Sequence, residues 1–195
     1  APSDDAGDHF GIHGRIGNLP AEQVNYDVGW SGEAYPLAVR GRVRQTRHYG
    51  ENLTLERQIS TAFASNIITV QDTVTNEGFE PQPHMILYHC NLGFPLISAE
   101  SELTMNAKET RPRDEAARPG LADWMRLQGP TAGYAEQVFH HILEPDDDNW
   151  SSATVYNPTI GLKLKISYTH RTLPHLIQWK QMGQGAYVLG LEPAN

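Results

Sequence analysis

Short segments in which apolar and polar residues alternate, set apart by glycine and proline, limit the fold of this chain most strongly. The 195 residues include 17 glycines and 13 prolines. Leu37–Tyr49 shows the pattern clearly, with Leu37, Val39 and Val43 at odd positions and arginines at even ones. A period of two places alternate side chains on opposite faces of a strand, and many short strands are typical of sandwiches and barrels. We therefore predict an all-β fold, an antiparallel β-sandwich, as a single domain over residues 1–195.

Six further segments carry a strand pattern: Asn52–Ser60, Asn66–Thr75, His84–Leu92, Leu162–Tyr168, Leu176–Met182 and Ala186–Glu192. The first two form a predicted hairpin, because only the short connection Thr61–Ser65 separates them. His84–Leu92 is apolar on both faces, which predicts a central strand of a sheet. A short helix is expected at Leu121–Leu127.

Charge and cysteine content exclude several classes of protein. The 15 basic and 23 acidic residues give a net charge of −8, which argues against binding to nucleic acids or anionic membranes. No apolar run approaches the roughly 20 residues of a membrane span. The single cysteine, Cys90, rules out an internal disulfide framework and predicts a reducing, cytoplasmic location. A homo-oligomer is compatible with these features.

Two charged residues interrupt apolar strand faces. Arg57 shares a face with apolar residues of its predicted strand, and Asp72 does so in the next strand. The short connection predicts that the two are diagonal neighbours on the inner side. An inward-facing arginine is costly unless it is paired. Two interpretations stay open: a structural ion pair, or an arginine that reaches into a ligand cavity and is held there by the aspartate. The stripe of Arg40, Arg42 and Arg44 is interpreted as a solvated face.

Polar residues also gather on two later strands. His89 and Asn91 share one face of the predicted central strand. Gly190 and Glu192 share a face of small side chains on the last predicted strand, which leaves room for a ligand beside the carboxylate. The ordinary alternatives stay open as well: a core histidine with satisfied hydrogen bonds, and an exposed strand end.

Other kinds of chemistry find little support in the sequence. The nine histidines suggest a metal site, but their spacing fixes no third ligand, so no metal is predicted. The chain has no Gly-x-Ser-x-Gly elbow, no glycine-rich phosphate loop and no dinucleotide fingerprint. Hydrolase triads and nucleotide chemistry are therefore disfavoured.

Four motifs, in their order along the chain, resemble those of the galactose mutarotase-like (aldose 1-epimerase) superfamily. They are His13-Gly14-Arg15, Val74-Thr75-Asn76-Glu77-Gly78 followed by Pro81 and Pro83, Tyr88-His89-Cys90-Asn91-Leu92-Gly93, and Leu189-Gly190-Leu191-Glu192-Pro193. The likeness is closest to the bacterial branch described as "aldose 1-epimerase family protein". Members of the superfamily have strands before the first motif and after the last, so the resemblance implies a truncated core of a larger sandwich.

The resemblance implies a carbohydrate-binding isomerase that interconverts sugar anomers by opening and closing the ring. This reaction needs one base and one acid, expected on either side of the sugar ring, and no cofactor. By resemblance, Glu192 is the general base, His89 is the general acid, and His13 is a second histidine near the ring oxygen. Arg15 and Arg57 would bind hydroxyls or an anionic substituent.

The expected partner is a small sugar, sugar acid or sugar phosphate. The predicted substrate-binding residues are Arg15, Arg57, Asp72, Asn91, Gln178, Trp179 and Lys180. Within this set, Trp179 would supply an apolar platform for a sugar face, with packing in the core as the open alternative, and Lys180 would favour an anionic sugar.

Two alternative functions remain open from the sequence. The first is a metal-dependent sugar isomerase on a cupin-like barrel, which would use some of the histidines. The second is a non-catalytic carbohydrate-binding domain on the same sandwich, which would keep its affinity for sugar if either acid–base group were lost.

Overall fold

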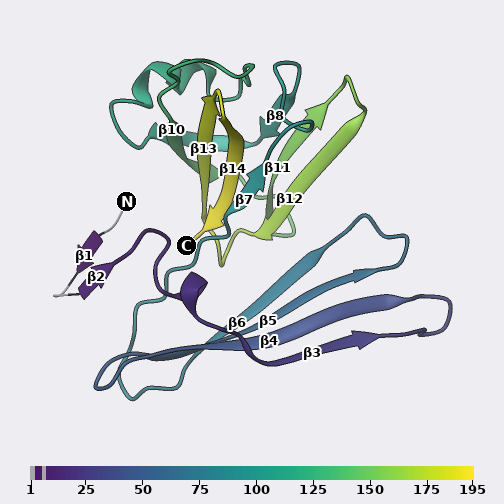
Figure 1. Ribbon diagram of the computed structural model, residues 1–195, viewed down its shortest axis with the longest axis vertical. Helices are drawn as coiled ribbons and strands as arrows, with labels where there is room; N and C mark the ends of the chain where they lie inside the picture. Colours follow the sequence, from purple (N-terminus) through teal and green to yellow (C-terminus); the bar gives the residue numbers. More distant parts are fainter. Residues whose placement is uncertain (1–2, 6–7) are drawn as a thin grey trace. The chain divides into compact units, whose positions relative to one another are not determined.

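The computed structural model describes residues 3–5 and 8–195, and the chain divides into two compact units, Ala1–Pro83 and His84–Asn195. In both units the regular structure is almost entirely antiparallel β-strand, as Figure 1 shows. The predicted all-β fold is confirmed. That the whole chain forms one sandwich domain stays a prediction.

The first unit is built from six described strands and one short 3-10 helix: β1 (Ser3–Asp5), β2 (Asp8–Phe10), η1 (Ile16–Asn18), β3 (Glu22–Val28), β4 (Pro36–Thr46), β5 (Asn52–Ala62) and β6 (Thr69–Asn76). β1 pairs with β2, and β3 to β6 form a four-stranded sheet in chain order. The strand predicted from Leu37 and the predicted hairpin are therefore present. β1, β2 and β3 were not predicted.

The β5–β6 hairpin joins Arg57 to Asp72. The two residues lie directly opposite each other, so the predicted diagonal arrangement is wrong by two positions. The connection between the strands is longer than predicted, and a shift of two residues keeps every side chain on its face. Arg57 Nε donates to Asp72 Oδ1 at 2.8 Å, and Nη2 donates to Oδ2 at 2.6 Å. The Asp72 side chain is only 5% exposed, so this two-bond pair holds a nearly buried carboxylate.

The stripe of arginines on β4 is matched by carboxylates. Arg40 pairs with Asp27 of β3, while Arg42 and Arg44 both contact Glu77 just after β6. These side chains are partly exposed, so the pairs fit a solvated face with modest electrostatic stabilisation.

The second unit contains two sheets. Its elements are β7 (Cys90–Leu92), β8 (Glu102–Met105), β9 (Ala107–Pro112), η2 (Arg118–Asp123), β10 (Gln137–Leu143), β11 (Trp150–Asn157), β12 (Leu162–Thr169), β13 (His175–Gly183) and β14 (Ala186–Ala194). The sheet orders are β7-β14-β13-β10-β9 and β12-β11-β8. Figure 1 shows the two sheets facing each other, with β13 and β14 in yellow.

The core of the second unit lies between these sheets. Buried apolar side chains from both sheets form one cluster, which includes Leu103, Leu143, Val155, Leu176, Met182, Leu189 and Leu191. The second unit is thus a β-sandwich in which alternate residues of each strand point into the core.

Two predicted elements differ in the structure. Only the last three residues of His84–Leu92 form a strand, β7, and it lies at the end of its sheet rather than in the centre. The residues before β7 lie beside the end of β14 but do not form a regular strand with it. One of their contacts is a 2.9 Å hydrogen bond from Tyr88 N to Pro193 O. Met85 is 82% exposed, so apolar character on both faces did not mean burial on both faces. The helix expected at Leu121–Leu127 is the 3-10 helix η2, which begins three residues earlier.

A chain of hydrogen bonds crosses the buried face of the five-stranded sheet. Thr110 Oγ1 lies 2.9 Å from His141 Nδ1, and His141 Nε2 lies 3.0 Å from Gln178 Oε1. Gln178 Nε2 then donates to the Trp124 carbonyl at 2.8 Å. His141 is 1% exposed, and burial lowers its pKa to about 4. The neutral imidazole is therefore the form that the fold accommodates.

This burial predicts how stability depends on pH. The folded-state pKa of His141 lies below the ordinary value of about 6.5, so protonation favours the unfolded chain and stability is lost as pH falls below that value. Between pH 7 and pH 4.5 the free energy of unfolding should drop by about 2.5 kcal/mol through this residue. Urea denaturation of the wild type and of His141→Gln at both pH values measures the difference. Equal losses in the two proteins would contradict the assignment.

Candidate active site

The pairing of β13 with β14 gathers several predicted site residues on one face of the sheet. Trp179 lies opposite Gly190, and Ile177 lies opposite Glu192. On the other side of β14, Asn91 of β7 also lies opposite Gly190. Because residues opposite each other share a face, Glu192, Trp179 and Asn91 all belong to the face that points away from the core.

Gly190 makes this arrangement possible. A β-carbon at this position would lie 2.5 Å from Glu192 Oε1 and 3.1 Å from Trp179 Cβ. The carboxylate and the indole therefore occupy the space above the strand that a side chain would fill. The small residues beside Glu192 were predicted to leave room for a ligand, and the space directly above Gly190 is taken by the Glu192 carboxylate and the Trp179 side chain.

His89 and Glu192 form the chemical centre of this face. His89 Nε2 lies 3.2 Å from Glu192 Oε1, and the Trp179 ring stands nearly perpendicular to the imidazole with the ring centroids 5.7 Å apart. The Glu192 side chain is 7% exposed and that of His89 is 30% exposed. The predicted acid and base are thus brought together in direct contact, which differs from the expected placement on either side of a sugar ring.

The indole of Trp179 is fixed by residues that the sequence analysis missed. Trp179 Nε1 donates to Glu136 Oε2 at 2.9 Å, and Arg113 Nη2 donates to Glu136 Oε1 at 3.0 Å. The hydrogen bond from Trp179, followed by those from Arg113, lowers the pKa of the Glu136 carboxyl. Both Arg113 and Glu136 lie outside regular strands, where no periodic pattern could signal their direction.

Strand alternation separates the other two predicted residues of β13 from Trp179. Gln178 lies opposite Leu191, and Lys180 lies opposite Leu189, so both side chains are on the core face. Gln178 and Lys180 are 0% and 3% exposed. We therefore do not group them with Trp179 and Glu192 in one site.

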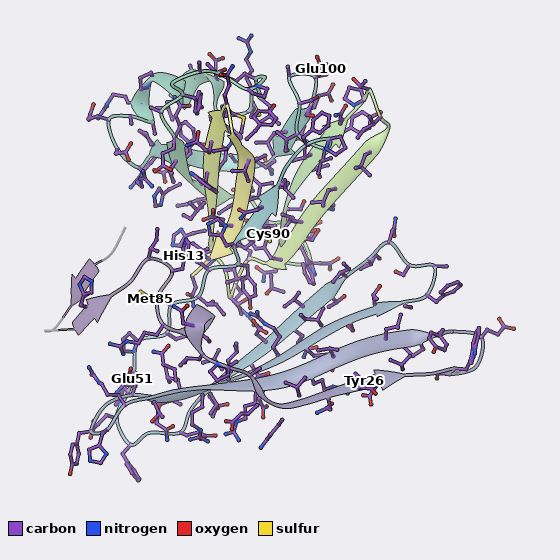
Figure 2. All side chains as sticks on the ribbon, in the orientation of Figure 1. His13, Tyr26, Glu51, Met85, Cys90 and Glu100 are labelled. Carbon is purple, nitrogen blue, oxygen red and sulfur yellow. The ribbon has the colours of Figure 1, made fainter. Side chains whose placement is uncertain are left out.

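The remaining predicted residues belong to the first unit. His13 lies in a turn at φ 67° and is followed by Gly14 at φ 69°, so both have the left-handed conformation that is uncommon for a histidine. Arg15 pairs with Glu51, whose other carboxylate oxygen lies 3.2 Å from Arg47 Nε. Figure 2 labels His13 after β2 and Glu51 beside the start of β5.

Two observations bear on the metal-dependent barrel as an alternative. Among residues 3–5 and 8–195, no three His, Cys, Asp or Glu side chains form a group that could hold a metal ion. The described strands form open sheets with end strands rather than a closed barrel.

Within residues 3–5 and 8–195, no helix has the length and apolar character that crossing a membrane would take.

Comparisons with known proteins give two matches. The model of a family described as "Domain of unknown function (DUF4432)" matches residues 1–195. A crystal structure described as "a putative aldose 1-epimerase" from Klebsiella pneumoniae subsp. pneumoniae MGH 78578 is similar, with 29% sequence identity and a TM-score of 0.92 over 99% of this chain. The chain spans 50% of that solved chain. No curated protein matches. The structural match confirms the resemblance to the galactose mutarotase-like superfamily.

Replacing Gly190 with alanine tests the packing of the site. The added methyl would overlap the Glu192 carboxylate, so we expect a loss of about 1–3 kcal/mol in stability and a displaced His89–Glu192 contact. Urea denaturation and the NMR chemical shifts of the His89 ring report the two effects. Gly93→Ala is the matched control, because its β-carbon would meet only Tyr187 O at 3.9 Å. Unchanged His89 shifts in the Gly190 variant would argue against this packing.

Proposed function

Since the chain belongs to the DUF4432 family and shares its fold with a structure described as "a putative aldose 1-epimerase", we propose that it is an aldose 1-epimerase-like isomerase acting on the anomers of a sugar. The observation that carries the proposal is the contact between His89 and Glu192 beside the indole of Trp179. A carboxylate and an imidazole are the side chains best suited to move protons near neutral pH.

The direct contact suits the chemistry of ring opening. The anomeric hydroxyl and the ring oxygen are bonded to the same carbon, so an adjacent base and acid can reach both from one edge of the sugar. In the proposed step, the Glu192 carboxylate accepts the proton of the anomeric hydroxyl while protonated His89 gives a proton to the ring oxygen. The bond from the anomeric carbon to the ring oxygen breaks, and a free aldehyde forms.

Closing the ring reverses these transfers. After rotation about the bond between the first two sugar carbons, His89 recovers the proton from the hydroxyl and Glu192 returns its own to the aldehyde oxygen. Atoms and protons balance over the cycle, and no group or electron leaves the sugar. Trp179 would support an apolar face of the sugar, and Asn91, which is exposed on the same face, would bind a hydroxyl.

For three residues of the first unit, the roles stay predictions from the family resemblance. They are His13 near the ring oxygen of a sugar, and Arg15 and Arg57 as binding groups for hydroxyls or an anionic substituent. The paired Asp72 would hold the Arg57 guanidinium in its orientation.

Glu192→Gln keeps the shape of the side chain and removes the base. We expect it to slow anomer exchange by at least about 100-fold, the typical contribution of a general base, with little change in sugar affinity. Exchange is followed by NMR over a panel of neutral, acidic and phosphorylated sugars. Glu144→Gln is the control, because Glu144 is 52% exposed and contacts Lys108 outside the site. A full rate in Glu192→Gln would refute the proposal, and wild-type binding without any exchange would favour a carbohydrate-binding domain.

Arg57 distinguishes a ligand-binding role from a structural one. Arg57→Leu leaves the nearly buried Asp72 without its two-bond partner, so we expect a loss of about 1–3 kcal/mol in stability. If Arg57 also binds the sugar, affinity falls as well, by about tenfold or more. The double variant Arg57→Leu/Asp72→Leu removes the stranded charge and should recover stability without recovering affinity. A double variant that binds sugar as the wild type does would assign the pair a structural role alone.

A further inference from the structure

A polar cavity lies on the core side of the five-stranded sheet, on the face of β13 opposite Trp179. Its volume is about 380 Å³. Lys180 of β13 and Gln137 of β10 lie directly opposite each other and line it together. The residues around η2 and the segment before β10 supply further lining, namely Gly120, Asp123, Arg126 and Tyr134. This volume falls within the range of about 300–1,000 Å³ that is usual for small-molecule sites.

The lining groups are oriented as hydrogen-bond donors. Tyr134 Oη donates to Gln137 Oε1 at 3.0 Å, which fixes the Gln137 amide so that Nε2 is the end left to donate. Lys180 Nζ donates to the carbonyl of Arg126 at 2.8 Å and lies 3.4 Å from the carbonyl of Asp123. An ammonium has three donors, so one remains beyond these two contacts. The Arg126 guanidinium, another lining group, is also donor-only.

The charge of the cavity is positive. Lys180 and Arg126 outweigh Asp123, and no carboxylate in the described part of the chain lies within ion-pair distance of Lys180. A buried ammonium with only carbonyl partners is costly. Burial lowers the pKa of Lys180 to about 8, Arg126 acts in the same direction, and Asp123 opposes both. An anion in the cavity would offset this cost.

Gly120 helps to keep the cavity in this form. A β-carbon at Gly120 would overlap the amide group of Gln137, with Oε1 as the nearest atom. The glycine thus allows the η2 backbone to lie against Gln137 without displacing the amide from Tyr134.

We propose that this cavity is a binding site for a small molecule carrying an oxyanion, either a carboxylate or a phosphate, held by Lys180, Arg126 and Gln137. The lysine that the sequence suggested for an anionic sugar would therefore serve a separate ligand. The proposal does not depend on the proposed isomerase activity, because its cavity lies on the other face of β13.

Binding is measured by calorimetry and thermal unfolding with inorganic phosphate and with acetate, at ionic strength matched with chloride. We expect one of the two anions to bind and raise Tm above the chloride control, and the better of them identifies the group recognised. Arg126→Gln should weaken binding by about tenfold, and Lys180→Met should abolish it. Lys108→Met is the matched control, because this lysine is 67% exposed, pairs with Glu144 and does not line the cavity.

Two further measurements keep the test decisive. If Lys180→Met fails to fold, anion affinity is compared between the wild type, Arg126→Gln and Gly120→Ala. The alanine at position 120 would displace the Gln137 amide. Affinity for the anion that binds should also fall about tenfold or more from pH 7 to pH 9.5 as Lys180 loses its proton, since burial lowers the pKa of Lys180 to about 8 and raises that of Tyr134. Effects of phosphate and acetate no larger than that of chloride, or equal affinities in all variants, would overturn the proposal.

Discussion

The register between β13 and β14 is the constraint on which the chemistry of the second unit depends. Placing Trp179 opposite Gly190 sets the indole over a position without a side chain, and the carboxylate of Glu192 uses the same space. A slip of one residue would send Glu192 into the core, where a carboxylate without a partner is very costly. The nine paired positions of this strand pair therefore fix the site more firmly than any single contact within it.

The direct contact between His89 and Glu192 affects how protons would pass between these two side chains in the proposed reaction. The Glu192 side chain, which is 7% exposed, lies 3.2 Å from the His89 imidazole. In the proposed reaction, a base and an acid in contact would also return protons to each other between turnovers. Two groups separated by the width of a sugar ring would need solvent for that exchange. Glu136, held by Arg113, fixes the indole beside them, so the ring against which a sugar would lie is oriented before binding.

The sequence predicted β4, β5, β6, β12, β13 and β14, because alternation is a local property that each strand carries in its own residues. It did not predict β1, β2, β3 or β8 to β11. Alternation also predicted that Gly190 and Glu192 share one face of β14, which the register confirms. The sequence misplaced His84–Leu92, since apolar residues on both faces occur in a central strand and also in an edge segment such as the one that includes the exposed Met85. It also grouped Gln178, Trp179 and Lys180, although consecutive residues of a strand point to opposite faces. The contribution of Glu136 could not be predicted, because its position depends on the path of a loop.

The two faces of β13 carry different kinds of polar chemistry for a physical reason. On the outer face, Trp179 is partly exposed and Asn91 is exposed, so water can replace a missing partner of these two side chains. On the core face, Gln178 and Lys180 must find protein partners, and both find backbone carbonyls of the segment around and just after η2. Carbonyl oxygens satisfy hydrogen bonds but do not neutralise an ammonium. The Gln178 amide therefore has hydrogen-bond partners for both its oxygen and its nitrogen. Lys180 has carbonyl partners for two of its three donors, but no carboxylate among the described residues pairs with its charge. That difference makes the lysine, and not the glutamine, the group on this face that favours an anionic ligand.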